Sequence, residues 1–149
     1  MNEHISPQEC IFCKIVRGEG PAYRVFEDER TLIFMDIFPV APGHTLIIPK
    51  MHGTNILAVE ERDLQIVAAH SRRLAHAQRE VFEPDGIAVF QLNGAAAGQT
   101  VFHYHTHLIP RMAGDTIEIH SRTPGDPAVL EETARKLATA FDAVEAGEF

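Results

Sequence analysis

Apolar stretches separated by polar segments along the chain predict five short strands. The five stretches are rich in β-branched and aromatic residues, and residues typical of turns bound them. They span residues 23–27, 31–36, 44–48, 87–92 and 103–109. The first two flank the polar turn Asp28-Glu29-Arg30 and predict a hairpin, and Pro49 ends the third strand.

Two longer segments show helical periodicity. Between residues 60 and 82, apolar or small side chains recur at mostly three- or four-residue spacing, which predicts a long amphipathic helix. A second helix is predicted over 127–145, with Asp126 as N-cap and Pro127 at its first position. Strands follow one another through short connections and helices do not alternate with them. The expected fold class is therefore α+β, with a mainly antiparallel five-stranded sheet, one long helix and a C-terminal helix.

Length and composition predict one domain over residues 1–149, with a flexible segment at 1–9. Hydrophobic residues make up 45% of the chain, and no apolar run approaches the ~18 residues that cross a membrane. The first ten residues lack the pattern of a secretory signal, so a cytoplasmic protein with no membrane partner is expected. A net charge of −8 disfavours nucleic acid as a partner, because Lys and Arg dominate phosphate-backbone binding.

Three histidines, His103, His105 and His107, occupy alternate positions of the predicted strand 103–109. Alternate side chains of a strand project from the same face, so the three imidazoles are expected to share one surface. At ~3.3 Å per residue the outer two lie ~13 Å apart on a straight strand, which disfavours a single metal ion held by all three. The spacing indicates that one ring does chemistry while its neighbours bind charge or metal.

The loop that precedes these histidines, residues 93–99, is built of small residues. Gly94 and Gly98 let backbone amides approach an anion, and Asn93, Gln99 and Thr100 add side-chain donors. The loop predicts a phosphate site, and a flexible connection between two strands is the alternative.

Two cysteines, Cys10 and Cys13, are the only ones in the chain. Their C-x-x-C spacing is half of a zinc site, since closed zinc sites take four Cys or His ligands. A redox pair, or two reduced packing residues, are the alternatives.

Together these segments carry a resemblance to a known family. The strings NGAAAGQTVFHYHTHLIPR, FMDIFPVAPGHTLIIPKMHG and CIFCKIVRGE resemble the histidine triad (HIT) proteins of bacterial type over about residues 10–111. Thr106 departs from the family pattern, in which this position is usually apolar. The resemblance implies a HIT-like fold and a homodimer.

Roles for the site residues are implied by the same resemblance. His105 would attack the α-phosphorus of a purine nucleotide, while His107 and His44 would contact phosphate and deliver protons. Asp36 would accept hydrogen bonds from the ribose, and the phosphates would meet the loop residues Asn93, Gly98, Gln99 and Thr100. Phe34, Ile37 and Ile48 are candidates for the base pocket, and each is equally credible as core. The implied substrates are purine nucleoside phosphoramidates, adenylylated species or dinucleoside polyphosphates.

The resemblance also implies a structural zinc ion. HIT proteins with the cysteine pair carry one histidine after a Pro-Lys dipeptide and use the first triad histidine as well. The implied ligands are Cys10, Cys13, His52 and His103, and no organic cofactor is expected.

Two other functions fit the same sequence. One is a nucleotide-binding regulatory or scaffold protein with little turnover, and the other is a zinc enzyme in which His103 and His105 hold an activated water. Several remaining residues receive no chemical role at this point: His4, His70, His76, His120, Lys50 and Arg111.

Overall fold

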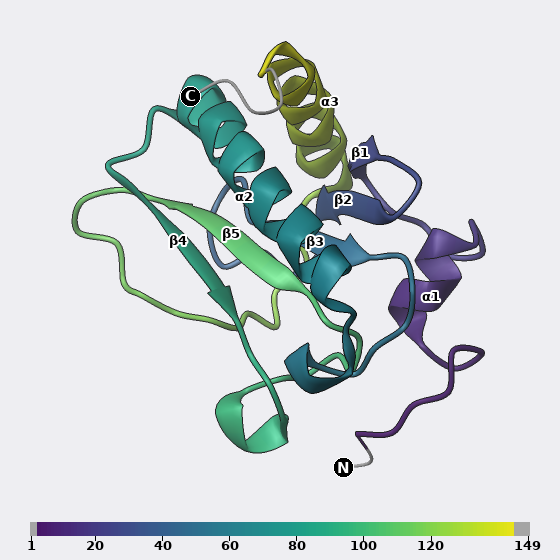
Figure 1. The fold of residues 1–149 in the computed structure, drawn as a ribbon. Coiled ribbons are helices and arrows are strands. Elements are labelled where there is room, and N and C mark those ends of the chain that lie inside the picture. Colours follow the sequence, from purple (N-terminus) through teal and green to yellow (C-terminus); the bar gives the residue numbers. More distant parts are fainter. Residues whose placement is uncertain (1–2, 145–149) are drawn as a thin grey trace.

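The computed structural model describes residues 3–144, in which five strands form one antiparallel sheet in the order β1-β2-β3-β5-β4 (Figure 1). The strands are β1 (Arg24–Glu27), β2 (Thr31–Met35), β3 (Thr45–Pro49), β4 (Gly86–Gln91) and β5 (Thr106–Arg111). The β1–β2 hairpin forms as predicted. The structure therefore confirms the α+β class and the five-stranded antiparallel sheet.

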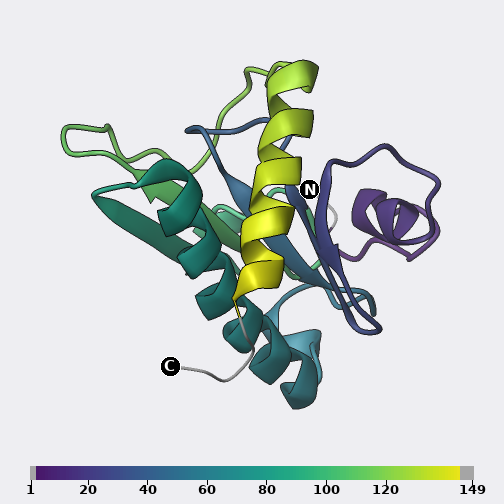
Figure 2. The ribbon, with the colours of Figure 1, turned by 90° about the horizontal axis from the view of Figure 1, so that it is seen from above.

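Two helices, α2 (Glu61–Phe82) and α3 (Pro127–Ala143), cover one face of the sheet (Figure 2). Asp126 caps α3 as predicted, since its carboxylate accepts a hydrogen bond from the Ala128 amide at 2.9 Å. Residue 145, the predicted end of this helix, lies outside the described residues. Among residues 3–144, no helix is both long enough and apolar enough to cross a bilayer.

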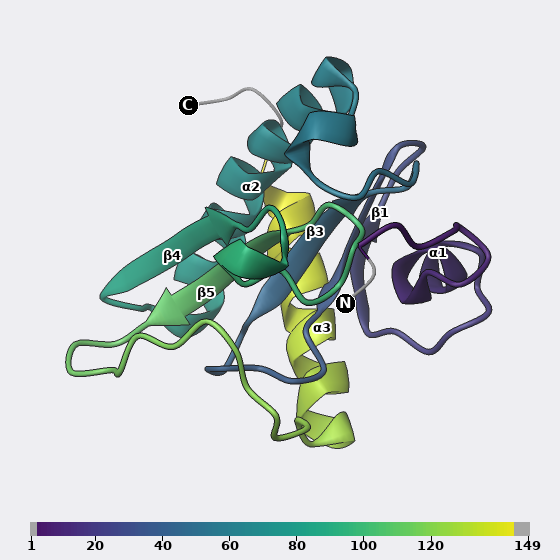
Figure 3. The same ribbon diagram turned by 90° about the horizontal axis from the view of Figure 1, so that it is seen from below.

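On the opposite face of the sheet, a short helix that the sequence analysis did not predict, α1 (Ile11–Val16), packs against residues of β2 and β3 at one side of the sheet (Figure 3). Successive side chains of β2 alternate between the two layers, so Leu32 and Phe34 pack toward α1 while Ile33 and Met35 pack toward α2 and α3. Phe12 and Cys13 are the buried residues of α1. Six residues are too few for helical periodicity to be visible in the sequence.

The predicted strand 103–109 is wrong at its start, because β5 begins at Thr106 and contains only the last of the three histidines. Thr106 is the first residue of β5 that pairs with both β3 and β4. Before it the chain leaves the sheet, and the Tyr104 amide donates to the Gly53 carbonyl at 2.7 Å instead. Pro110 is the penultimate residue of β5 and pairs with Ile87 of β4 beyond the last β3 pairing, where no β3 acceptor needs its missing amide hydrogen.

Candidate functional site

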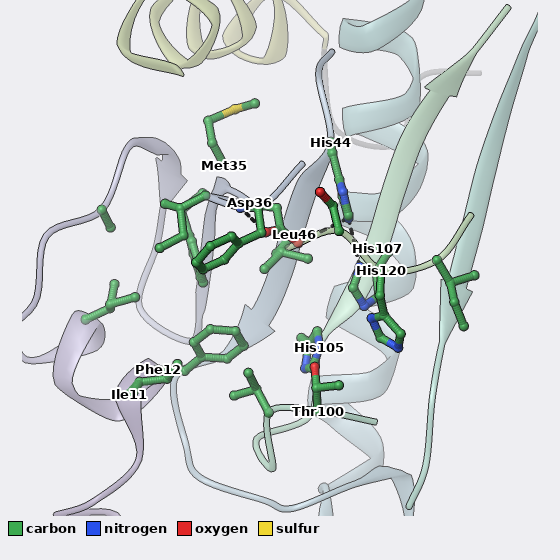
Figure 4. Close-up of a pocket in the computed structure, with 18 of the residues that line it drawn as sticks. Ile11, Phe12, Met35, Asp36, His44, Leu46, Thr100, His105, His107 and His120 are labelled. Carbon is green, nitrogen blue, oxygen red and sulfur yellow. Dashed lines mark hydrogen bonds and ion pairs between the residues drawn. The ribbon is translucent and has the colours of Figure 1, made fainter. Parts of the chain in front are cut away.

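A pocket opens on the α1 side of the sheet, where the end of β2 and the start of β3 lie near the start of β5 (Figure 4). Apolar residues of α1 and β2, among them Ile11, Phe12 and Phe34, form one wall. His105 and His107 lie at the other end of the pocket, and Figure 4 shows both rings directed into it. The structure thus combines a polar histidine cluster with an apolar recess.

His105 presents an unprotonated nitrogen to the pocket. Its Nδ1 lies 2.7 Å from the His103 carbonyl oxygen, which can only accept a hydrogen bond, so Nδ1 carries the proton and Nε2 the lone pair. The ring is buried, and this burial lowers the pKa of His105 below its usual 6.5. Phe12 packs edge-on against the ring with 5.2 Å between centroids. His105 is therefore neutral and held in one orientation, with a lone pair directed into the pocket.

His44 and His107 form a hydrogen-bonded pair whose tautomers follow from one backbone contact. The Val40 amide donates to Nδ1 of His44 at 3.2 Å, so the proton of a neutral His44 is on Nε2. That Nε2–H lies 2.9 Å from Nδ1 of His107, which must accept, and the proton of His107 is therefore on Nε2. Burial lowers the pKa of both rings, that of His44 to about 3. His107 thus offers a donor and His105 a lone pair.

Asp36 follows β2 and lies beside this pair. Its Oδ2 is 3.3 Å from Nε2 of His44, and its Oδ1 accepts from the Phe38 amide at 2.8 Å. Burial raises the pKa of the Asp36 carboxyl to about 6, although the Phe38 hydrogen bond opposes the shift. The site therefore holds a carboxylate that is costly to ionise.

We expect Asp36→Asn to change how stability depends on pH. The folded protein binds the Asp36 proton more tightly than the unfolded chain, whose pKa is 3.8. This contribution to stability is complete below the unfolded pKa and is lost as the pH rises to about 6. Urea unfolding should show Asp36→Asn gaining about 2 kcal/mol relative to wild type between pH 4 and 7.5.

The matched control for this prediction is Asp142→Asn, which neutralises an exposed carboxyl on α3. Because this side chain is exposed, its stability difference from wild type should change less over the same pH range. A change for Asp36→Asn no larger than that for Asp142→Asn would contradict the raised pKa of Asp36.

The structure does not bring all the predicted loop residues to the pocket. Gln99 is buried, with its Oε1 accepting from the Gly94 amide at 2.7 Å and its Nε2 donating to the Thr54 carbonyl at 2.6 Å. Asn93 Oδ1 accepts from the Ile56 amide at 2.8 Å. These side chains therefore hold the loop in shape. Of the predicted phosphate contacts Asn93, Gly98, Gln99 and Thr100, only Thr100 lines the pocket.

Of the three candidates for a base pocket, Phe34 and Ile37 line the cavity. Ile48 does not, because it is fully buried in the layer between the sheet and α1.

The four predicted metal ligands come together at the N-terminus of α1. Sγ of Cys13 lies 3.3 Å from Nδ1 of His52 and 3.5 Å from Nδ1 of His103, and Cys10 Sγ is also 3.5 Å from His103. Tetrahedral zinc with ordinary bond lengths separates sulfur and nitrogen ligands by ~3.6 Å, so the residues fit the ion. His103 Nε2 donates to the Pro49 carbonyl at 2.7 Å, which leaves its Nδ1 unprotonated toward the sulfurs.

The protonation state of Cys13 also bears on whether these four residues can bind zinc. Burial, together with the neighbouring Cys10 thiol, raises the pKa of Cys13 to about 12, so in the absence of a cation this thiol is neutral. A zinc ion would displace its proton, as zinc does at thiolate sites.

Two other metal arrangements fail on hydrogen-bonding grounds. His103 donates from Nε2 to the Pro49 carbonyl and directs Nδ1 at the cysteine sulfurs, so it has no lone pair left for a zinc ion shared with His105, which lies outside the cysteine cluster. Asp36, His44 and His107 also lie within ligand distance of one another. The Val40 amide, however, makes Nε2 of His44 a proton donor, so the group is organised as a hydrogen-bond network.

Three residues of the site were not assigned a role from the sequence. Phe12 contacts His105 from an unpredicted helix, and Phe90 of β4 stacks on His107 with 4.6 Å between centroids. His120, expected to have no chemistry, lines the pocket. For these three residues, the sequence offered a single clue to a place in the site, which is the position of Phe12 between the two cysteines.

Three histidines at alternate positions leading into β5, faced by His44 from the start of β3, define a histidine triad protein. The HIT domain family model matches residues 17–114, and the chain belongs to this family of nucleotide-binding proteins and hydrolases.

Among its relatives, Protein hit from Bacillus subtilis is 45% identical over 135 residues, which cover 88% of this chain and 93% of that protein. Adenylylsulfatase HINT3 from Arabidopsis thaliana is 40% identical over 134 residues, which cover 88% of this chain and 66% of the plant protein.

Solved structures agree with the fold. A zinc-bound histidine triad family protein from Mycobacterium smegmatis superposes with a TM-score of 0.81 at 39% identity, covering 92% of this chain and 96% of the other. A hypothetical histidine triad nucleotide-binding protein from Sulfolobus tokodaii gives a TM-score of 0.82 at 31% identity, covering 89% and 92%.

Proposed function

We propose that the protein hydrolyses or transfers nucleotides by attack of His105 on an α-phosphorus. The substrates are purine nucleoside phosphoramidates, adenylylated species or dinucleoside polyphosphates. The observation that carries this proposal is the hydrogen bond from His105 Nδ1 to the His103 carbonyl, which directs a neutral lone pair into the pocket. The name of the plant relative, an adenylylsulfatase, supports an adenylyl group as the part that is transferred.

The reaction proceeds in two steps on this proposal. In the first, Nε2 of His105 bonds to phosphorus while the bond to the leaving group breaks and its electron pair departs with that group. An amine leaving group takes its proton from Nε2 of His107. In the second step, water attacks the phosphorus, its proton restores His107, and the electron pair of the N–P bond returns to His105.

The nucleoside occupies the apolar part of the pocket. Ile11, Phe12, Phe34 and Ile37 provide an apolar recess for a purine, which stacks favourably on aromatic rings. The Asp36 carboxylate, at the border between this recess and the histidines, accepts hydrogen bonds from ribose hydroxyls. Phosphate then lies between His105, His107 and Thr100.

Zinc is the proposed structural cofactor, held by Cys10, Cys13, His52 and His103. With four protein ligands it keeps no open position for water, so it supplies no Lewis acid to the reaction. Zinc would instead hold two pocket residues in place. His103 carries the carbonyl that orients His105, and Cys10 caps the helix that carries Phe12.

The test is a set of AMP derivatives that differ only in the leaving group: an amine, an acyl group and a second nucleotide. Wild-type protein is expected to release AMP from at least one class, and quenching at alkaline pH during turnover, where the N–P bond survives, should trap AMP on His105, detected by peptide mass spectrometry. Turnover without a trapped adduct would contradict covalent catalysis. Tight AMP binding without turnover of any class would favour the regulatory or scaffold alternative.

A homodimer and a cytoplasmic location remain predictions. The position of β4 at the edge of the sheet supports the first, since edge strands offer unpaired backbone groups, and Val89 on this strand is 52% exposed.

A further inference from the structure

The segment that follows β5 lines part of the pocket and is held there by three hydrogen bonds. Arg111 at the end of β5 donates from Nη2 to the Glu118 carbonyl at 2.6 Å. His120 donates from Nε2 to the Gly98 carbonyl at 2.7 Å, and the Gly125 amide donates to the Ile37 carbonyl at 2.8 Å. These anchors bring the stretch 119–121 against the histidine cluster, beyond residue 114 where the family match ends.

His120 lies at the histidine end of the pocket, away from the apolar recess. Figure 4 shows its ring beside His107 and on the other side of His105 from Ile11 and Phe12. Burial is the main cause of the lowered pKa values of His105 and His107, and positive charge on His120 lowers both further. A charge at His120 therefore acts directly on the reacting groups.

This location is where a leaving group would meet the protein. In-line attack by His105 places the departing atom opposite Nε2, and a nucleoside in the apolar recess leaves the His120 side for the rest of the substrate. Among the described residues that line the pocket, none is a lysine or an arginine. The triad histidines and His44 are buried, whereas His120 is exposed. Its Nδ1 takes no part in the Gly98 bond.

We propose that His120 is a specificity-determining residue that favours AMP derivatives with an anionic leaving group, such as sulfate or phosphate. The inference rests on the proposed function. Sulfate departs with the electron pair of the broken P–O bond and needs no proton, so its recognition depends on a nearby cation. An amine leaving group needs the His107 proton instead, and it carries no negative charge that could pair with His120.

The experiment compares kcat/KM for adenosine 5′-phosphosulfate and for adenosine 5′-phosphoramidate. Both form the same nucleotidyl-His105, so a change in their ratio reports on the leaving group alone. His120→Ala should lower kcat/KM for the phosphosulfate by roughly tenfold and change that for the phosphoramidate by less than about twofold. His120→Gln, which retains a donor for the Gly98 carbonyl, should resemble His120→Ala, and His120→Lys should recover much of the loss.

Arg122→Ala is the matched control, because it removes a cation from the same segment at a residue that does not line the pocket. It should leave the ratio unchanged. An equal loss on both substrates with His120→Ala, a ratio unmoved by any His120 variant, or recovery with glutamine rather than lysine would each overturn the proposal. Failure of wild-type protein to turn over either substrate would instead overturn the proposed function.

Discussion

Replacing His105 with alanine is expected to abolish turnover, with AMP release at least about 10⁴-fold slower than in wild-type protein. The variant lacks the lone pair that attacks phosphorus, and the nearest alternative ring, His107, directs a proton rather than a lone pair into the pocket. Among the described pocket residues, His120 is the other histidine whose ring is oriented by a backbone carbonyl, and on our proposal it lies on the leaving-group side of the phosphorus. The measurement is steady-state AMP release together with detection of the adduct after an alkaline quench.

The fold of this variant should persist, because His105 contributes one hydrogen bond and an edge-on contact with Phe12 outside the main core. His70→Ala is the control: it removes a histidine that pairs with Asp28 at 2.9 Å and does not line the pocket. It should keep wild-type activity. AMP release within about tenfold of wild type by a folded His105→Ala variant would exclude nucleotidyl-His105 as the intermediate.

The sheet was predictable from sequence because its inner strands bury both faces and read as unbroken apolar runs. β2 and β3 are buried at every position, and the turn residues between elements mark where each begins. Periodicity reports how side chains alternate but not where pairing starts. The strand assigned to His103 and His105 was therefore wrong. The three rings have different hydrogen-bond partners in the structure, and their separate roles stay a prediction.

The site was predictable to the level of residue types and not to the level of hydrogen bonds. Gln99 is a good phosphate donor in isolation, yet its amide is used entirely by the Gly94, Thr54 and Val101 backbone. The tautomer of His44 depends on the Val40 amide, which becomes a partner only when the turn before β3 has formed. Such partners are set by tertiary structure, and the same holds for His120, whose place depends on the Arg111 anchor.

Loss of both cysteines of the proposed zinc site should strongly destabilise the protein. In Cys10→Ser/Cys13→Ser, the proposed zinc site loses both thiolates, and the free energy of unfolding is expected to fall by about 5 kcal/mol. The helix α1 is only six residues long and is capped by Cys10, so it has little stability of its own. Zinc content by mass spectrometry should fall from one ion per chain to none, and urea unfolding should show the loss of stability.

Lys14→Ser provides the control, since it alters the same helix at an exposed residue that is not a ligand. It should retain zinc and nearly all of the stability. A double cysteine variant that still holds one zinc per chain would contradict the structural site, because Cys10 and Cys13 are the only thiols in the sequence. Metal loss should also loosen Phe12, whose ring packs 5.3 Å from Phe34 and 5.2 Å from His105. The variant is therefore expected to bind AMP more weakly as well, which separates a zinc ion that positions the pocket from one that only stabilises the fold.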